Sequence, residues 1–346
     1  MVIRIECLPS IDDLAVTKRS STPPTDPSLA TDADVYHAYR LILGRDPDPD
    51  GLAHYRQLIT DGLTVDALAR TFLHSDEHTQ RIGQERRNDE AVIDLGGYQV
   101  IVRRSDPDFG ADIAHWRVYE EPVRDALREL LTVGDTCLDV GANIGVMTFL
   151  AAAAVGPTGR VIAVEPNPDN VQLLYRGILL NRCSNVEVLP LAAAGHQAIV
   201  GLSGRSNTRL MGPDSAAPPA WFVQSVTLDE TLATLPKLDV IKMDIEGTEA
   251  AALRGLERLI TTHRPALVVE FNPRCLKQQG EDPAAFVAQI LELYPDIRVV
   301  SQFGDDRRFA RADDLVSFWH RREAEVAAAG KLPSGLLHFD LVTERR

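Results

Sequence analysis

Apolar and polar residues follow two different periods along this chain. Between residues 34 and 82 the apolar side chains recur every three or four positions, which predicts three short amphipathic helices. From residue 90 onward, apolar runs of strand length alternate with helical stretches, an order typical of a doubly wound α/β sheet. We therefore predict a small all-helical domain over residues 34–85 and an α/β domain over residues 90–346.

Apolar runs bounded by turn residues mark the strands of the α/β domain. The predicted strands are residues 91–95, 98–103, 160–164, 186–189, 240–243, 266–271, 297–302 and 336–343, with another buried strand ending at Asp139. The first two should form a hairpin around Gly96 and Gly97. A charged, partly helical insert over residues 305–329 separates the last two strands, which is compatible with an antiparallel closing hairpin.

Residues 1–33 precede the helical pattern, and the part from residue 18 is too rich in proline, serine and threonine to build a core. We predict a flexible tail or linker there. The segment 46–51, Asp-Pro-Asp-Pro-Asp-Gly, should be a turn whose aspartates cap the second helix. Calcium binding is disfavoured because neither the ligand spacing nor the closing glutamate of an EF-hand loop follows.

Glycines and acids follow two strands near the start of the α/β domain. The strand ending at Asp139 leads into Gly141-Ala142-Asn143-Ile144-Gly145, a tight turn before a helix, whose free N–H groups can hold a polar ligand. The next strand delivers Glu165, a carboxylate able to accept hydrogen bonds from ribose hydroxyls. Asn143 replaces the glycine that lets a pyrophosphate approach, and Asp139 suits an ammonium group. We therefore predict S-adenosylmethionine as the cofactor.

A second group of ionisable residues follows two later strands. Lys242 and Asp244 share one strand face because side chains alternate, and Glu246 comes just before Gly247 breaks the strand. Glu270 ends the next strand, so all four side chains should face one pocket at the sheet edge where ligands bind. The alternative is an ion-pair lattice in which Lys242 neutralises Glu246 or Glu270. Only a magnesium or calcium site with oxygen ligands would be possible here, and we expect no metal.

Composition narrows the classes of partner. The net charge of −14 over 346 residues argues against binding to nucleic acid or to an anionic membrane. Four cysteines without C-x-x-C spacing suggest neither a zinc cluster nor a disulfide framework. The start lacks a long apolar segment, and no run approaches the roughly 20 apolar residues of a membrane span. We expect a soluble, cytoplasmic protein without stable membrane insertion.

Five motifs in order resemble the FkbM family of S-adenosylmethionine-dependent methyltransferases. They are the glycine turn, Glu165-Pro166-Asn167-Pro168, residues 226–230, residues 242–249 and Val268-Val269-Glu270, preceded by Tyr119-Glu120-Glu121-Pro122. The resemblance covers residues 95–275. It implies a Rossmann-like, seven-stranded methyltransferase sheet and, for many members, O-methylation of hydroxyls on sugars or macrolide-type natural products. We therefore expect a sugar, glycoside or polyketide acceptor and no nucleic-acid partner.

The resemblance also implies roles by position. Asp139 and residues 141–145 would line the methionyl moiety, Glu165 would bind the ribose, and Asp244 and Glu246 would border the transferred methyl group. We expect Asp244 or Glu246 to be the general base. Glu270 and His115 are the next candidates for that role, and Lys242 is expected in the same catalytic group. The expected cofactor contacts are completed by Tyr119 and Glu121, which would close the pocket, by Pro166 and Asn167, and by Ala192 and Ala193 at the adenine edge.

Several alternatives stay open at this stage. A nucleic-acid methyltransferase is disfavoured because an N-P-P-Y motif is absent after Asp244, and Phe271-Asn272-Pro273 follows the wrong strand. A non-catalytic scaffold is the other alternative. The loop 201–209, with Ser206, Asn207 and Arg209, is either a substrate cover or a solvent hairpin. The segment 43–52 resembles a helical module of glycan-modifying proteins, and it could equally serve for homo-oligomer or partner contact.

Overall fold

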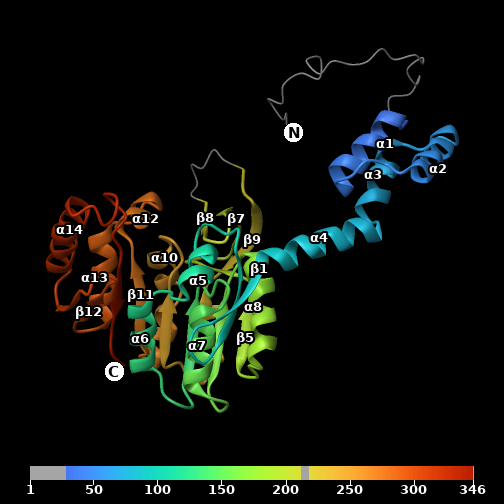
Figure 1. The fold of residues 1–346 in the computed structure, drawn as a ribbon. Coiled ribbons are helices and arrows are strands. Elements are labelled where there is room, and N and C mark those ends of the chain that lie inside the picture. Colours follow the sequence, from blue (N-terminus) through green and yellow to red (C-terminus); the bar gives the residue numbers. More distant parts are fainter. Residues whose placement is uncertain (1–28, 212–217, 346) are drawn as a thin grey trace. The chain divides into compact units, whose positions relative to one another are not determined.

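The computed structural model describes residues 29–211 and 218–345, except for the side chains of residue 82 and residues 84–87 (Figure 1). The chain divides into two compact units, Met1–Asn88 and Asp89–Arg346. Most of the predicted tail lies outside the described residues. Its last residues are folded, because Leu29 pairs with Thr64 and a capping box at Thr31 begins the first helix earlier than predicted.

The first unit contains the predicted helices. They are α1 (Asp32–Ala38), continued by the π-helix η2 (Tyr39–Leu43), α2 (Pro49–Thr60) and α3 (Val65–Leu73), and a further helix, α4 (Asp76–Asp89), follows them. The Asp48 side chain accepts a hydrogen bond from the backbone N–H of Gly51, which confirms the predicted capped turn. Val35, Leu68 and Phe72 are buried and form part of its small core.

The second unit is built on an eight-stranded sheet, in the order β13-β12-β14-β11-β10-β3-β4-β5. Its strands are β3 (Thr136–Val140), β4 (Arg160–Val164), β5 (Val186–Leu189), β10 (Val240–Met243), β11 (Ala266–Phe271), β12 (Ile297–Val300), β13 (Asp306–Phe309) and β14 (Phe339–Val342). Strand β14 runs antiparallel to β11 and β12, which confirms the closing hairpin. The predicted doubly wound sheet is thus confirmed, and β13, inside the charged insert, adds an eighth edge strand.

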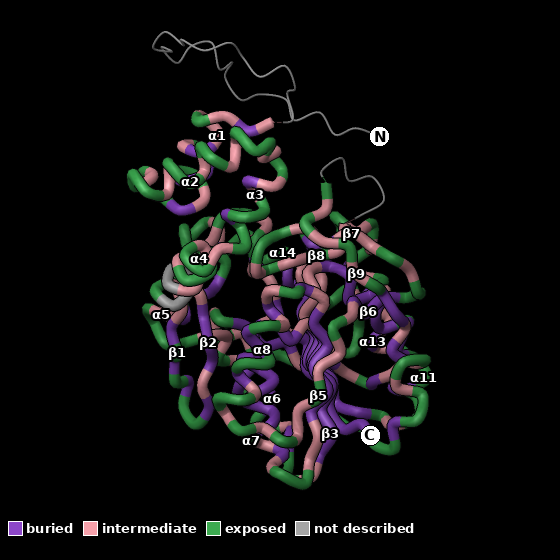
Figure 2. Tube along the Cα trace, turned by 90° about the vertical axis from the view of Figure 1, so that its right-hand side faces the viewer, coloured by how far each residue is buried: buried purple, intermediate pink, exposed green. Residues whose placement is uncertain are grey.

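Helices cover both faces of this sheet because successive strand residues point to opposite sides. Leu138 and Val140 pack in one core cluster, whereas Cys137 between them packs in the other. Helices α5 (Gly110–Trp116), α6 (Glu121–Leu130), α7 (Val146–Val155) and α8 (Pro168–Asn181) supply the Cys137 cluster. The opposite cluster contains α10 (Glu249–Arg254), α11 (Glu257–His263), α12 (Pro273–Gln278), α13 (Pro283–Leu293) and α14 (Ala312–Ala328). Figure 2 shows the central strands as the buried part of the unit.

Two smaller sheets complete the unit. The hairpin of β1 (Glu90–Asp94) and β2 (Gln99–Arg103) forms as predicted. A four-stranded sheet of β6 (Ala192–Ala193), β9 (Trp221–Val226), β7 (Ala198–Gly204) and β8 (Thr208–Leu210), followed by the short helix α9 (Leu228–Thr231), was not predicted. Strands β6 and β8 escape pattern recognition because they have only two and three residues, and glycine and serine interrupt the apolar alternation of β7.

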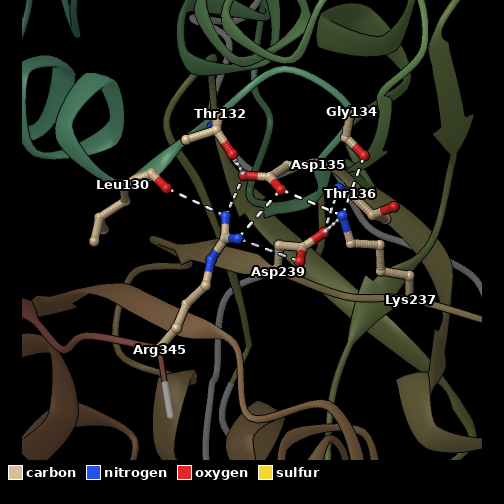
Figure 3. Close-up of polar contacts among 8 residues, drawn as sticks. All are labelled: Leu130, Thr132, Gly134, Asp135, Thr136, Lys237, Asp239 and Arg345. Carbon is tan, nitrogen blue, oxygen red and sulfur yellow. Dashed lines mark hydrogen bonds and ion pairs between the residues drawn. The ribbon is translucent and has the colours of Figure 1, made fainter.

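The amino ends of β3 and β10 are tied together by a charged cluster (Figure 3). The Arg345 guanidinium pairs with Asp135 and lies 3.3 Å from Asp239, and Lys237 pairs with the same two carboxylates at 3.3 and 3.0 Å. Although burial opposes it, the hydrogen bond from Arg345 lowers the pKa of Asp135 to about 2. This network closes the edge of the sheet opposite to the site described below. Among the described helices, none combines the length and the hydrophobicity needed to cross a bilayer.

Candidate active site

A cavity of about 340 Å³ lies where the parallel strands β3, β4, β10 and β11 end. Its walls come from the turns that follow those strands, from Ala192 and Ala193, and from the hairpin of β7 and β8. Ligands in open α/β sheets bind at this edge because the strand ends and helix starts leave backbone groups free there. The structure therefore brings both predicted groups of residues into one site.

The glycine turn, residues 141–145, closely approaches the turn that follows strand β10. Gly141 has φ 81°, and a Cβ atom at this position would lie 1.9 Å from the backbone oxygen of Asp244. Ala142 and Asn143 line the cavity, and the Asn143 N–H donates to Glu165 Oε2 at 2.8 Å. Gly145 does not line the cavity. A Cβ there would meet the rings and methyls of Phe149 and Leu174, so this glycine serves helix packing.

Glu165 lines the cavity beside Pro166, although its side chain is only 3% exposed. Its second oxygen, Oε1, accepts the Asn167 N–H at 2.8 Å. Burial raises the pKa of Glu165 to about 7, against the lowering effect of these backbone hydrogen bonds. Asn167 is buried and caps α8, and its amide donates to the backbone oxygen of Arg205, so it holds the β7–β8 turn instead of facing the cavity.

Asp139 does not line the cavity, contrary to the prediction for the methionyl ammonium. Its side chain is 1% exposed, and Oδ2 accepts a hydrogen bond from the Thr148 hydroxyl at 2.6 Å. Asp139 and Lys242 are register partners on adjacent strands, with Nζ 3.7 Å from Oδ1. The carboxylate therefore lies beneath the site, where it holds the lysine.

Lys242 contacts both predicted groups of residues, the glycine turn after β3 and the carboxylates after β10. Its Nζ lies 3.8 Å from Asp244 Oδ2 and donates to the backbone oxygen of Gly141 at 3.2 Å. Burial opposes the charge, but Asp244 and Asp139 raise the pKa of Lys242 above its ordinary value. Lys242 thus forms ion pairs, as the alternative predicted, but its partners are Asp139 and Asp244 and not Glu246 or Glu270.

The turn after β10 concentrates carboxylates. Asp244, Glu246 and Glu270 line the cavity, and Glu249 lies just behind them. Glu246 adopts the left-handed conformation, φ 57°, which is costly for a residue with a side chain. Glu249 Oε1 stabilises this turn by accepting the N–H groups of Ile245 and Gly247 at 2.9 and 3.2 Å. Burial and the nearby Asp244 charge raise the pKa of both Glu246 and Glu270.

The residues before α6 correct one assignment. Tyr119 lines the cavity as predicted by position, but it is Glu120, and not Glu121, that lies beside it. Glu120 has φ 41°, which turns its side chain inward, whereas Glu121 begins the helix and is exposed. Burial raises the pKa of Glu120 to about 7. The two consecutive glutamates are visible in the sequence, but their directions depend on this left-handed residue.

The remaining candidates divide between the cavity and the surface. Ser206, Asn207 and Arg209 line the cavity, and the Asn207 amide donates to Glu246 Oε1 at 2.5 Å. His115 is exposed on α5 and does not line the cavity. His338, which no sequence motif indicated, lines it, and with Glu120 it also borders an adjacent cavity of about 590 Å³.

The observed cavity can accommodate parts of S-adenosylmethionine. The missing side chain at Gly141 leaves the turn backbone open, Glu165 offers a carboxylate at the end of β4, and Ala192 and Ala193 provide a small apolar wall. These features match the backbone, ribose and base contacts that a nucleoside cofactor requires. Asp139 is excluded from that set because it does not line the cavity.

Two domain families match parts of this chain. Residues 139–304 match the family model described as the methyltransferase FkbM domain, and residues 28–82 match a domain of unknown function, DUF4214. An arsenite methyltransferase of Halobacterium salinarum is 40% identical over 63 residues, which are 18% of this chain and 16% of that protein.

Two solved structures are similar at low TM-scores. Methyltransferase FkbM from Methylobacillus flagellatus is 20% identical over 57% of this chain and 60% of its own, with a TM-score of 0.36. An S-adenosylmethionine-dependent O-methyltransferase from Thermotoga maritima is 12% identical over 66% of each chain, with a TM-score of 0.34. This chain spans less than two thirds of the length of each of these three proteins. The family model thus identifies residues 139–304, just under half of this chain, as a methyltransferase FkbM domain.

Proposed function

We propose that this methyltransferase acts on a hydroxyl group of a sugar, glycoside or polyketide-type small molecule. The observation that carries the proposal is the convergence of Asp244, Glu246 and Glu270 on one cavity wall, at the ends of β10 and β11. A hydroxyl is a poor nucleophile at neutral pH, and a positioned carboxylate that accepts its proton contributes about 10² to 10⁴-fold in rate. An amine or thiol acceptor would need such a base less.

S-adenosylmethionine, when bound, supplies an electrophilic methyl group. The task of this chain is to hold the acceptor oxygen in line with that group and to exclude water, which is a large part of catalysis by orientation. Asp244 or Glu246 would accept the acceptor proton. Lys242 would hold Asp244 in place, and the Asn207 amide fixes one oxygen of Glu246.

Charge and size support a small, uncharged or cationic acceptor. The adjacent cavity that shares Glu120 and His338 is lined by further acids, including Asp305, Asp306 and Asp340. An anionic acceptor would be repelled there, which disfavours nucleic acid. The cavity at the strand ends is at the small end of the usual range for small-molecule sites, about 300 to 1,000 Å³.

The test begins with calorimetric titration of the full chain with S-adenosylhomocysteine, using NADH as a control. Turnover with labelled S-adenosylmethionine is then screened over sugar and polyketide alcohols. Asp244→Asn and Glu246→Gln should retain S-adenosylhomocysteine affinity, and one of them should lose at least about a hundredfold in turnover. The matched control is Glu257→Gln, since Glu257 is exposed at the start of α11 and lines neither cavity.

Three outcomes would contradict the proposal. Absence of S-adenosylhomocysteine binding would favour the scaffold alternative. Transfer to an amine but to no alcohol would reject the hydroxyl acceptor. Full turnover in both Asp244→Asn and Glu246→Gln at neutral pH would reject both residues as the base, and Glu120→Gln would then be the next variant to measure.

A further inference from the structure

Three carboxylates behind and beside the cavity wall point their oxygens at one another. Asp244 follows β10, Glu249 begins α10 and Glu270 lies near the end of β11, so three separate elements contribute. One oxygen from each lies within 4.8 Å of the oxygens of the other two. Glu249 is fully buried and Glu270 is 8% exposed. Acids this close and this buried need a compensating charge or protons.

Two of these carboxylates have an oxygen that no group in the described part of the chain satisfies. Glu249 Oε2 and Glu270 Oε2 are buried without a hydrogen-bond partner. The other oxygen of Glu249 is occupied by two backbone N–H groups, and Glu270 Oε1 lies 3.4 Å from the Asn272 amide. A buried polar atom without a partner costs about 1 to 3 kcal/mol, so it calls for a ligand.

Nearby cations do not fill this role. Within the described residues, the ion pairs of Lys242 go to Asp139 and Asp244, and no lysine or arginine lies within 4.0 Å of the Glu249 or Glu270 carboxylate. Glu246 is excluded from the cluster because its oxygens contact the Asn207 amide and the Cys275 thiol. Glu249 and Glu270 are therefore left without a cationic partner, and Asp244 shares Lys242 with Asp139.

The geometry points to a divalent-cation site formed by Asp244, Glu249 and Glu270. Oxygen ligands alone select a hard cation. Calcium accepts several carboxylate ligands in a flexible geometry, whereas magnesium demands a near-ideal octahedron and usually keeps several waters. A largely buried site with three carboxylates from the protein therefore suits calcium better than magnesium. Calcium should bind more tightly than magnesium.

The site would also sharpen the proposed reaction. Asp244 and Glu270 line the cavity, so an ion between them would face the acceptor and could hold its oxygen. This consequence, unlike the ion site itself, rests on the proposed function. With Asp244 in the ligand set, Glu246 would be the residue left to accept the acceptor proton.

The experiment titrates the full chain with Mn²⁺ after chelator treatment and follows free Mn²⁺ by electron paramagnetic resonance. One saturable site per chain should appear, and Ca²⁺ should displace Mn²⁺ at lower concentration than Mg²⁺ does. Glu249→Gln keeps a carbonyl oxygen that can accept the N–H groups of the turn, and it removes one ligand charge. Both Glu249→Gln and Glu270→Gln should weaken Mn²⁺ binding at least about tenfold. Glu257→Gln, at the exposed start of α11, is the matched control and should bind as the unaltered chain does.

Two results would overturn the site. One is the absence of saturable Mn²⁺ binding to the unaltered chain. The other is equal Mn²⁺ binding in the unaltered, Glu249→Gln and Glu270→Gln chains. Either result would mean that bound protons, and not a metal ion, neutralise the three carboxylates. If these variants fail to fold, as judged by circular dichroism, Asp244→Asn serves instead, since Asp244 is partly exposed. S-adenosylhomocysteine binding is measured on the same samples. If S-adenosylhomocysteine binds and Mn²⁺ does not, only the proposed ion site is rejected. If Mn²⁺ binds and S-adenosylhomocysteine does not, only the proposed function is rejected.

Discussion

Gly141→Ala should be far more damaging than the same change at a glycine of similar conformation. Gly141 has φ 81° and Gly96 has φ 86°, so alanine at either position pays the left-handed penalty of roughly 1 to 2 kcal/mol. At Gly96 no atom lies within 4 Å of the added Cβ, whereas at Gly141 the Asp244 oxygen lies at 1.9 Å. The difference between the two variants therefore isolates the contact between the glycine turn and the β10 turn.

The magnitude follows from how far the backbone must move. A Cβ rarely approaches a backbone atom closer than 3.0 Å, so the β10 turn must shift by more than about 1 Å. Overpacking of this kind costs typically about 1 to 3 kcal/mol. We expect the free energy of unfolding to fall by about 2 to 5 kcal/mol in Gly141→Ala and by about 1 to 2 kcal/mol in Gly96→Ala.

The assay is urea unfolding of the full chain followed by tryptophan fluorescence. All three tryptophans, Trp116, Trp221 and Trp319, lie in the second unit, so the signal reports on that unit. S-adenosylhomocysteine affinity should drop in Gly141→Ala and stay unchanged in Gly96→Ala, because only the first displaces the cavity wall. Equal losses of stability, within about 0.5 kcal/mol, would refute the close-contact argument.

Three further predictions concern buried charges in the second unit. Lys242→Met leaves the Asp139 carboxylate buried without its cation and should lower the free energy of unfolding by about 3 to 5 kcal/mol in the same urea assay. The control Lys237→Met removes a half-exposed lysine and should lower it by about 1 kcal/mol or less. Glu165 has a folded pKa of about 7, raised above its reference value, so its contribution to stability is present at low pH and lost as pH rises through about 7. Glu165→Gln should accordingly gain stability relative to the unaltered chain between about pH 5 and pH 8, and the opposite trend in urea unfolding would contradict the assignment. Arg345→Gln should destabilise the unit, and since the pKa of Asp135 is lowered to about 2, the loss seen at neutral pH should shrink as pH falls toward that value; a loss independent of pH would mean that Arg345 acts through packing alone.

Local patterns in the sequence were sufficient for most of the fold. The predicted strands 160–164, 186–189, 240–243 and 266–271 coincide with β4, β5, β10 and β11, because a buried parallel strand requires a continuous apolar run bounded by breakers. The last two predicted strands are each shorter in the structure, where pairing ends before the apolar pattern does. The helical unit follows equally from its period and from the Asp48 cap.

The same local reasoning also indicated which end of the sheet carries the site. Gly141, Glu165 and Asp244 follow parallel strands and Glu270 lies near the end of one, and such strands end at one edge of the sheet. Nothing more than the position of a residue in its strand is needed for that inference. The resemblance to the FkbM family likewise rested on short motifs that are continuous in sequence.

Tertiary structure decided which side chains enter the cavity and which lie beneath it. Asp139 faces Lys242 because the register of β3 with β10 pairs them, and a register between strands about a hundred residues apart leaves no local pattern. Glu120 lines the cavity in place of Glu121, and its left-handed backbone conformation, φ 41°, leaves no trace in the local sequence pattern. The encounter of Asp244, Glu249 and Glu270 likewise depends on three elements packing together. Local spacing sets where each residue lies along its own element, whereas partners across elements depend on registers and backbone angles that only the packed core imposes.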